Sequence, residues 1–210
     1  MRVLIPTYFD PDSDAKQWKK LLSAKVKPWA VILNPENGPG RQLSQTYVTL
    51  CNTLRQAGIS IFGYVHTSEA QRNKADVVKD IALWNHWYEV KNIFLDEAST
   101  SINDVGYYQE LHEQVRGPLI LNHGTVPPDA YLGVGDILVI FEDNYQTHKS
   151  VQFPAYVNKS KRFAQIIHST PQSKIQAVLK KVSETSEFVF VTDRKMPNPY
   201  AKLPSYSYEV

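Results

Sequence analysis

Apolar runs and helical patterns alternate along the whole of this chain. Eight short apolar runs end near residues 6, 34, 66, 96, 122, 142, 168 and 191. Between these runs, apolar residues at helical spacing predict helices over residues 12–24, 43–57, 74–88, 105–115 and 173–182, with a short turn or helix at 128–132. The repeat of roughly 20 to 30 residues fits one strand followed by one helix.

Eight such units predict an α/β fold, a (β/α)8 TIM-type barrel, here smaller than the ~250 residues typical of that fold. A doubly wound open sheet is the alternative, and the lack of a classical dinucleotide fingerprint favours the barrel. A single domain is expected over residues 1–210, because no linker, low-complexity tract or internal repeat marks a second one. A Pro- and Tyr-rich C-terminal tail without a clear period begins at about residue 194.

The fourth apolar run leads directly into two adjacent acids, Asp96 and Glu97. A charge at the edge of a hydrophobic core costs free energy unless it reaches water, a partner or a substrate. In α/β folds, sites are built at the carboxyl ends of the strands. The two acids therefore mark the predicted site. Alternation along a strand sends them to opposite sides, and parity alone leaves open which one faces the barrel axis.

Other polar and aromatic residues are expected at the same mouth of the barrel. The predicted strand-end residues are Tyr8, Asn34, Tyr64, His66, Asp96, Glu97, Asn122, His123, Glu142, Asp143, Tyr145 and His168. Carboxylates on separate strands, here Asp96 and Glu142, are what glycoside hydrolysis requires: one protonates the leaving oxygen, and the other acts as nucleophile or base. Tyrosines beside them suit a sugar cleft. A polysaccharide or oligosaccharide substrate is therefore expected, without a cofactor.

Two other functions stay open. The first is a carbohydrate-binding or cell-surface structural barrel without turnover. Separately, the acids could have a purely structural role, paired with Arg or Lys at the mouth. The second is a metal-dependent hydrolase built from His66, His123 and His168 around Asp96, although no His-x-His or His-x-x-x-His pair anchors such a site, and no metal ligands are predicted. The loop over residues 34–40 lacks the Gly-Lys-Ser/Thr ending of a nucleotide loop.

Composition narrows the partners. The net charge is only +2 with 21% charged residues, and the basic residues form no stripe that would bind nucleic acid. No apolar segment reaches the ~20 residues needed to span a membrane. The first apolar run, over residues 1–6, is too short for a signal peptide, so the chain is either cytoplasmic or exported with its leader removed.

The single Cys51 lies in a helical pattern and is expected to be a buried structural thiol. A glycosylation triplet at Asn158 matters only in a secreted protein.

Several sequence blocks resemble those of the spherulin-4-like family. They are residues 34–40 (NPENGPG), 63–67 (GYVHT) and 93–97 (IFLDE), and the C-terminal residues 198–206 are similar to the family's last block. The resemblance spans nearly the whole chain. It implies a (β/α)8 barrel related to glycoside hydrolases that cleave α-1,4-linked N-acetylgalactosamine or galactosamine polymers. Oligomeric state, the exact sugar, and endo or exo action stay open.

The same resemblance implies roles for three acids. Asp96 would be the nucleophile or stabilising carboxylate, Glu142 the general acid/base, and Glu97 a substrate-binding or supporting acid. Asp96 and Glu97 match a clear motif, whereas Glu142 is placed by strand order and by the preceding Phe141.

Overall fold

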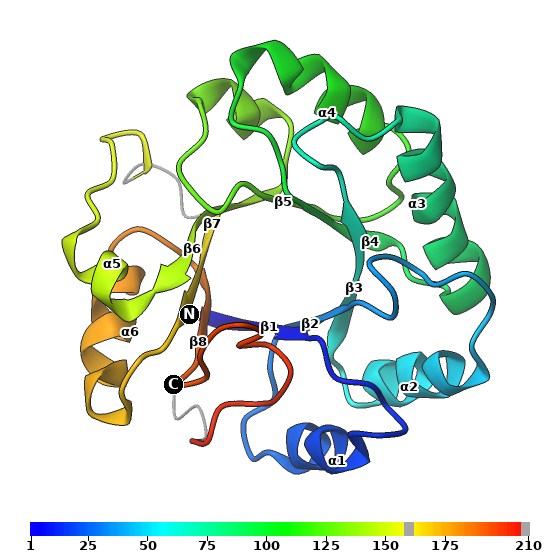
Figure 1. Ribbon diagram of the computed structural model, residues 1–210, viewed down its shortest axis with the longest axis horizontal. Helices are drawn as coiled ribbons and strands as arrows, with labels where there is room; N and C mark the ends of the chain where they lie inside the picture. The colour runs from blue at the N-terminus through cyan, green and yellow to red at the C-terminus, as the bar shows by residue number, and fades with distance from the viewer. Residues whose placement is uncertain (158–161, 207–210) are drawn as a thin grey trace.

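Eight parallel strands pair in chain order, and the first pairs with the last, so that the sheet closes into a barrel (Figure 1). The computed structural model describes residues 1–157 and 162–206. The glycosylation triplet at Asn158 lies outside the described residues. The strands are β1 (Arg2–Thr7), β2 (Ala30–Leu33), β3 (Ser60–His66), β4 (Asn92–Asp96), β5 (Leu119–Asn122), β6 (Ile137–Asn144), β7 (Phe163–His168) and β8 (Phe188–Val191).

Helices surround the barrel on the outside (Figure 1). They are α1 (Ala15–Ser23), α2 (Gln45–Gln56), α3 (Lys74–Tyr88), α4 (Val105–His112), α5 (Tyr145–Ser150) and α6 (Ile175–Ser183), with 3₁₀ turns η1 (Ile102–Asp104), η2 (Asp129–Gly133) and η4 (Gln172–Lys174). The predicted barrel is therefore confirmed. The pattern over residues 145–150 predicts no helix; α5 forms there because the side chain of Asn144 caps it, accepting from the amides of Gln146 and Thr147.

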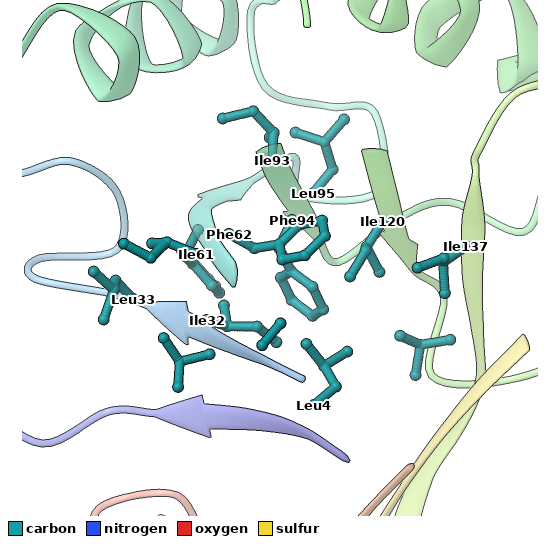
Figure 2. Close-up of a cluster of buried hydrophobic side chains, with 14 of the residues drawn as sticks. Leu4, Ile32, Leu33, Ile61, Phe62, Ile93, Phe94, Leu95, Ile120 and Ile137 are labelled. Atoms are coloured by element: carbon teal, nitrogen blue, oxygen red, sulfur yellow. The ribbon is translucent and has the colours of Figure 1, made fainter. Parts of the chain in front are cut away.

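The core is built from strand residues that alternate between the barrel axis and the helices. In β4, Phe94 points toward the barrel centre with Leu4 and Ile120, whereas Ile93 and Leu95 point toward the helices (Figure 2). Each of these side chains is fully buried. Because the strand period is two, Asp96 follows Phe94 toward the axis. The alternation of side chains along β4 thus directs Asp96, rather than Glu97, into the barrel.

A glycine in β3 makes room for the indole ring of α3. A Cβ atom added at Gly63 would lie 2.4 Å from the Trp84 ring, which is fully buried. The Trp84 Nε1 atom donates to the carbonyl oxygen of Tyr64, 2.9 Å away. Trp84 therefore holds the strand at the point where Tyr64 enters the mouth.

We expect Gly63→Ala to lower the free energy of unfolding by about 1–3 kcal/mol or more, because the added methyl overpacks a buried contact. Gly106→Ala is the matched control: a Cβ there meets nothing within 4 Å, so stability should stay unchanged or rise by up to about 1 kcal/mol. Urea unfolding curves of the two variants measure both effects. Equal stability of Gly63→Ala and the parent chain would contradict this account of the contact.

The segment after β8 packs onto the barrel rather than hanging from it. Residues 192–206, here called the C-terminal strap, lie beside β1 (Figure 1). The backbone amide of Tyr8 donates to the carbonyl of Tyr200 at 3.2 Å, and Leu203 donates to Gln17 of α1 at 3.1 Å. Tyr200 and Leu203 are buried. The described part of the predicted C-terminal tail is therefore packed against the barrel.

Two further features follow the sequence pattern. Cys51 is buried in α2, and burial raises the pKa of its thiol to about 12. Among the described residues, none of the helices combines the length and the apolar character needed to cross a bilayer.

Candidate active site

One asparagine joins two carboxylates at the mouth of the barrel. The Nδ2 atom of Asn122, at the end of β5, lies 2.6 Å from Oδ1 of Asp96 on β4 and 2.6 Å from Oε2 of Glu142 on β6. The Asn122 Oδ1 atom accepts from the backbone amide of Gly124 at 3.1 Å, which fixes the orientation of the amide group. Both of its N–H donors are therefore directed at the two acids.

The same geometry limits the separation of the acids. Since both oxygens lie 2.6 Å from one nitrogen, they are no farther apart than twice that distance. Retaining glycosidases hold their two carboxyl groups about 5–5.5 Å apart, and inverting enzymes about 6.5–9.5 Å. The pair Asp96 and Glu142 therefore has the short separation that suits attack on an anomeric carbon held between them.

Burial raises the pKa of both carboxyl groups. Burial, and then the nearby charge of Asp96, raise the pKa of Glu142 from its ordinary 4.5 to about 7. Burial also raises the pKa of Asp96, but Asp96 accepts hydrogen bonds from the side chains of Tyr64 and Asn122 and from the Glu97 amide, all of which favour its ionised form. Asp96 thus accepts from three donors, and Glu142 accepts from two, the side chains of Tyr200 and Asn122.

Aromatic rings form the low-dielectric surroundings of the pair. The Tyr8 ring packs edge-on against Tyr64 at 5.7 Å and against Tyr200 at 5.5 Å between centroids. Tyr64 stacks on Phe94, and Tyr200 packs against Phe190. The Tyr200 hydroxyl donates to Oε1 of Glu142 at 2.5 Å. Three tyrosines therefore reach the acid pair, two of them by hydrogen bonds to a carboxylate.

Glu97 has a different environment from Asp96, as alternation predicts. Its side chain is exposed, and its backbone lies in the left-handed region at φ +51°. The buried Thr67 hydroxyl donates to the carbonyls of Asp96 and Glu97 at 3.0 and 2.8 Å and contacts the Tyr108 hydroxyl at 3.0 Å. Strained backbone of this kind persists only where its surroundings hold it, and it gathers at functional sites. Here it turns Glu97 out of the barrel core.

A cleft opens beside Asp96 between the ends of β1, β2 and β3. It has a volume of about 650 Å³, and its lining includes Tyr8, Asn34, Tyr64 and Asn198. Oδ1 of Asn34 accepts from the Gly38 amide at 3.2 Å, so its Nδ2 group stays available for a ligand. On the other side of the pair, Glu142 lines a second cleft of about 860 Å³. The acids thus lie between two open spaces.

His66 is near this cleft and His123 is not. His66 ends β3 opposite Asp96 in register, and its Nδ1 atom lies 3.1 Å from the Asn37 carbonyl oxygen. His123 follows the inward-facing Asn122 and points the other way, where it packs edge-on against Tyr131. Burial lowers the pKa of His123 to about 4. His123 therefore lies in a buried aromatic environment apart from this cleft, and its role in substrate binding stays a prediction.

His168 and Tyr145 also lie apart from the acid pair's hydrogen-bond network. The Nε2 atom of His168 at the end of β7 is 4.0 Å from Oδ1 of Asp143, and burial lowers its pKa. Tyr145 begins α5 and packs against the cluster of Phe141 and α6. Within residues 1–157 and 162–206, no group of three His, Cys, Asp or Glu side chains could hold a metal ion. The three strand-end histidines thus occupy separate environments.

The acids are not held by basic partners. In the described part of the chain, neither Asp96 nor Glu142 forms an ion pair with Lys or Arg. Their charges are instead offset by neutral donors from Asn122, Tyr64 and Tyr200. Glu142 keeps a raised pKa in these surroundings, which suits proton transfer near neutral pH.

Sequence reasoning missed three residues of this site. Tyr200 and Asn198 come from the strap, and Thr67 holds the turn at Glu97. The strap has no hydrophobic period, so nothing in its pattern places it over the mouth. The available signal was the Asn-Pro-Tyr block itself, in which polar and aromatic residues interrupt a segment rich in proline.

Comparison with known proteins matches the chain to a family. The model of spherulation-specific family 4 (Spherulin4) matches residues 2–210. Spherulin-4 of Physarum polycephalum is 32% identical over 212 residues, which cover 92% of this chain and 63% of that protein. The chain therefore spans less than two thirds of the length of this curated relative.

Solved structures agree on the fold. The crystal structure of Aspergillus clavatus Sph3 in complex with GalNAc superposes with a TM-score of 0.82 at 24% identity, covering 97% of this chain and 93% of that one. A chitinase from Rhizomucor miehei superposes with a TM-score of 0.54 at 10% identity, covering 96% and 98%. At these identities the likeness establishes a TIM-like barrel.

Proposed function

The chain belongs to spherulation-specific family 4, and on that premise we propose that it is a glycoside hydrolase acting on α-linked N-acetylgalactosamine- or galactosamine-containing polysaccharide. The observation that carries the proposal is the Asn122-bridged pair of Asp96 and Glu142 at the barrel mouth. Glu142 is half-buried, forms no ion pair with Lys or Arg among the described residues, and has a pKa of about 7, as a general acid requires.

The proposed reaction proceeds in two displacements. Glu142 gives its proton to the glycosidic oxygen while a carboxylate oxygen of Asp96 attacks the anomeric carbon, so that the C–O bond to the leaving sugar breaks and a glycosyl-enzyme ester forms. Glu142, now ionised, takes a proton from water, whose oxygen attacks the same carbon and releases Asp96. The exposed Glu97 carboxylate at the rim is assigned to substrate binding. Two inversions give net retention of configuration.

The choice of sugar rests on the relatives and on the lining of the cleft. Sph3, which shares the fold over nearly the whole chain, was crystallised with GalNAc. The cleft beside Asp96 offers amide groups from Asn34 and Asn198 and the phenol rings of Tyr8 and Tyr64. Amides suit the hydroxyl and acetamido groups of an amino sugar, and aromatic faces suit its ring.

An assay of new reducing ends tests this function. We expect hydrolysis of α-1,4-linked N-acetylgalactosamine or galactosamine polymers and no hydrolysis of β-linked chitin oligomers, with the α-anomer formed first in proton NMR spectra because configuration is retained. Binding of the polymer without any new reducing ends, even after long incubation, would instead favour a carbohydrate-binding barrel. Initial formation of the β-anomer would refute the two-displacement reaction and leave hydrolysis standing.

A further inference from the structure

The C-terminal strap brings a phenol to the proposed general acid. The Tyr200 hydroxyl donates to Oε1 of Glu142 at 2.5 Å, while Asn122 donates to Oε2 at 2.6 Å. Each oxygen of this carboxyl group therefore has one fixed neutral donor. The two donors come from opposite parts of the chain, one from the end of β5 and one from a segment beyond β8.

Several contacts fix the position of Tyr200 in the strap. Its amide donates to Oδ1 of Asn198 at 3.1 Å, and its carbonyl accepts from the Tyr8 amide at 3.2 Å. The residue is 8% exposed, and its ring packs between Tyr8 and Phe190. The phenol has little freedom to turn away from Glu142.

The strap itself is anchored at a distance from the site. Leu203 is held by Gln17 through its amide and by Arg194 through its carbonyl, at 3.1 and 3.0 Å. The Ser205 hydroxyl donates to Asp193 at 2.6 Å, and Lys20 of α1 donates to the carbonyl of Pro204 at 2.8 Å. The bonds to Gln17 and from Lys20 join the strap to α1, the bonds of Arg194 and Asp193 lie within the strap, and none of the four involves the acids. The position of the phenol is therefore set by the fold rather than by Glu142.

We propose that Tyr200 is a positioning residue for the general acid, holding Oε1 of Glu142 and stabilising the carboxylate that remains after the proton has left for the glycosidic oxygen. The inference rests on the proposed function, which assigns the acid role to Glu142. A hydroxyl that donates to a carboxylate lowers the free energy of the ionised form and so makes the acid a better proton donor. A phenylalanine at this position would pack equally well and lack that effect.

Other titratable groups surround this contact and must be included in its test. Those that act on Tyr200, Glu142 or their neighbours are Asp96, Glu97, Asp143, Tyr8, Tyr64 and His168. All of them are unchanged in a Tyr200→Phe variant. A change in the titration of Glu142 in that variant therefore reports the loss of the hydroxyl.

The expected result for Tyr200→Phe is a kcat lower by roughly 10- to 100-fold with little change in KM, because a donor that strengthens in the transition state is lost. Loss of the donor raises the pKa of Glu142, so the alkaline limb of the pH–rate profile should move to higher pH. Tyr131→Phe is the matched control. It removes the hydroxyl of another buried tyrosine, which donates to the Ser101 carbonyl at 2.7 Å, and should leave the pH profile unmoved.

A measurement without substrate separates this inference from the proposed function. The carboxyl carbon of Glu142, in protein labelled with ¹³C-glutamate and assigned by its loss in Glu142→Gln, is titrated by NMR in the parent chain, Tyr200→Phe and Tyr131→Phe. A higher pKa in Tyr200→Phe alone supports the positioning role even if no polysaccharide is cleaved. An unchanged titration in Tyr200→Phe, or the same shift in Tyr131→Phe, overturns it.

Discussion

Replacing Asp96 with asparagine is expected to lower kcat on a galactosamine-containing polymer by about 10³-fold or more. The amide keeps the shape of the side chain and its neighbours in the barrel mouth, but it cannot form the glycosyl ester or stabilise a positive anomeric carbon as a carboxylate does. Release of reducing ends under single-turnover conditions measures the loss. Asp76→Asn in the first turn of α3 serves as a control, since Asp76 is exposed on an outer helix.

The same variant should change Glu142 in a defined direction. The charge of Asp96 is the second cause, after burial, of the raised pKa of Glu142. Removing that charge should lower the pKa of Glu142, which the NMR titration described above measures. If Asp96 is the nucleophile, azide should restore turnover in Asp96→Ala and give a glycosyl azide of inverted configuration. Full activity of Asp96→Asn would end its assignment as an essential acid.

Replacing Glu142 with glutamine is expected to lower kcat by about 10²–10⁴-fold, the usual contribution of a positioned general acid. The loss should be greatest for a natural sugar leaving group and small for an aryl glycoside whose phenolate leaves without a proton. It should also remove the alkaline limb of the pH–rate profile near pH 7, because that limb reports ionisation of Glu142. Equal losses for both kinds of substrate would contradict the acid role.

Protein stability gives an independent check on the same variant. In the folded protein Glu142 keeps its proton up to about pH 7, whereas in the unfolded chain it ionises near its ordinary 4.5. The folded state therefore binds more protons between these values, and stability falls as pH rises through that window. Glutamine cannot ionise, so Glu142→Gln should unfold at a higher temperature than the parent chain at pH 8 and at a similar temperature at pH 4. If Glu142→Gln instead unfolds at a lower temperature than the parent chain at pH 8, the ionised carboxyl group does not destabilise the folded protein, and this explanation is wrong.

The sequence by itself determined the barrel and its most important strand end. Strand and helix periods are local properties of neighbouring residues, so eight apolar runs with helical segments between most of them predicted a repeated βα unit. The lack of a dinucleotide fingerprint then favoured a closed barrel over an open sheet. The position of Asp96 and Glu97 was visible for the same reason, because the apolar run of β4 stops at a charge. Asp96 and Phe94 lie two positions apart and so share one side of the strand, but the sequence left open whether that side faces the barrel axis.

Helix α5, the environments of the histidines and the strap were decided by tertiary structure. Residues 145–150 form a helix through a cap at Asn144 and packing against β6 and β7, and neither leaves a period in the sequence. His123 stands one position after Asn122, and that single step of the strand sends it behind the barrel wall toward Tyr131. From the sequence alone, Asn122 and His123 were both expected at the barrel mouth, because both stand at the end of the same predicted strand.

The acid pair itself needed the closed barrel. Asp96 and Glu142 are placed on their strands by the sequence, but the bridge through Asn122 depends on the register of β4, β5 and β6 and on the inward side of each strand. Tyr200 joins them from a proline-rich segment that has no period, held by contacts to β1, α1 and β8. Local patterns record which residues are buried together in one element. Closure of the sheet decides which side chains from different elements meet. That closure exists only in the folded chain.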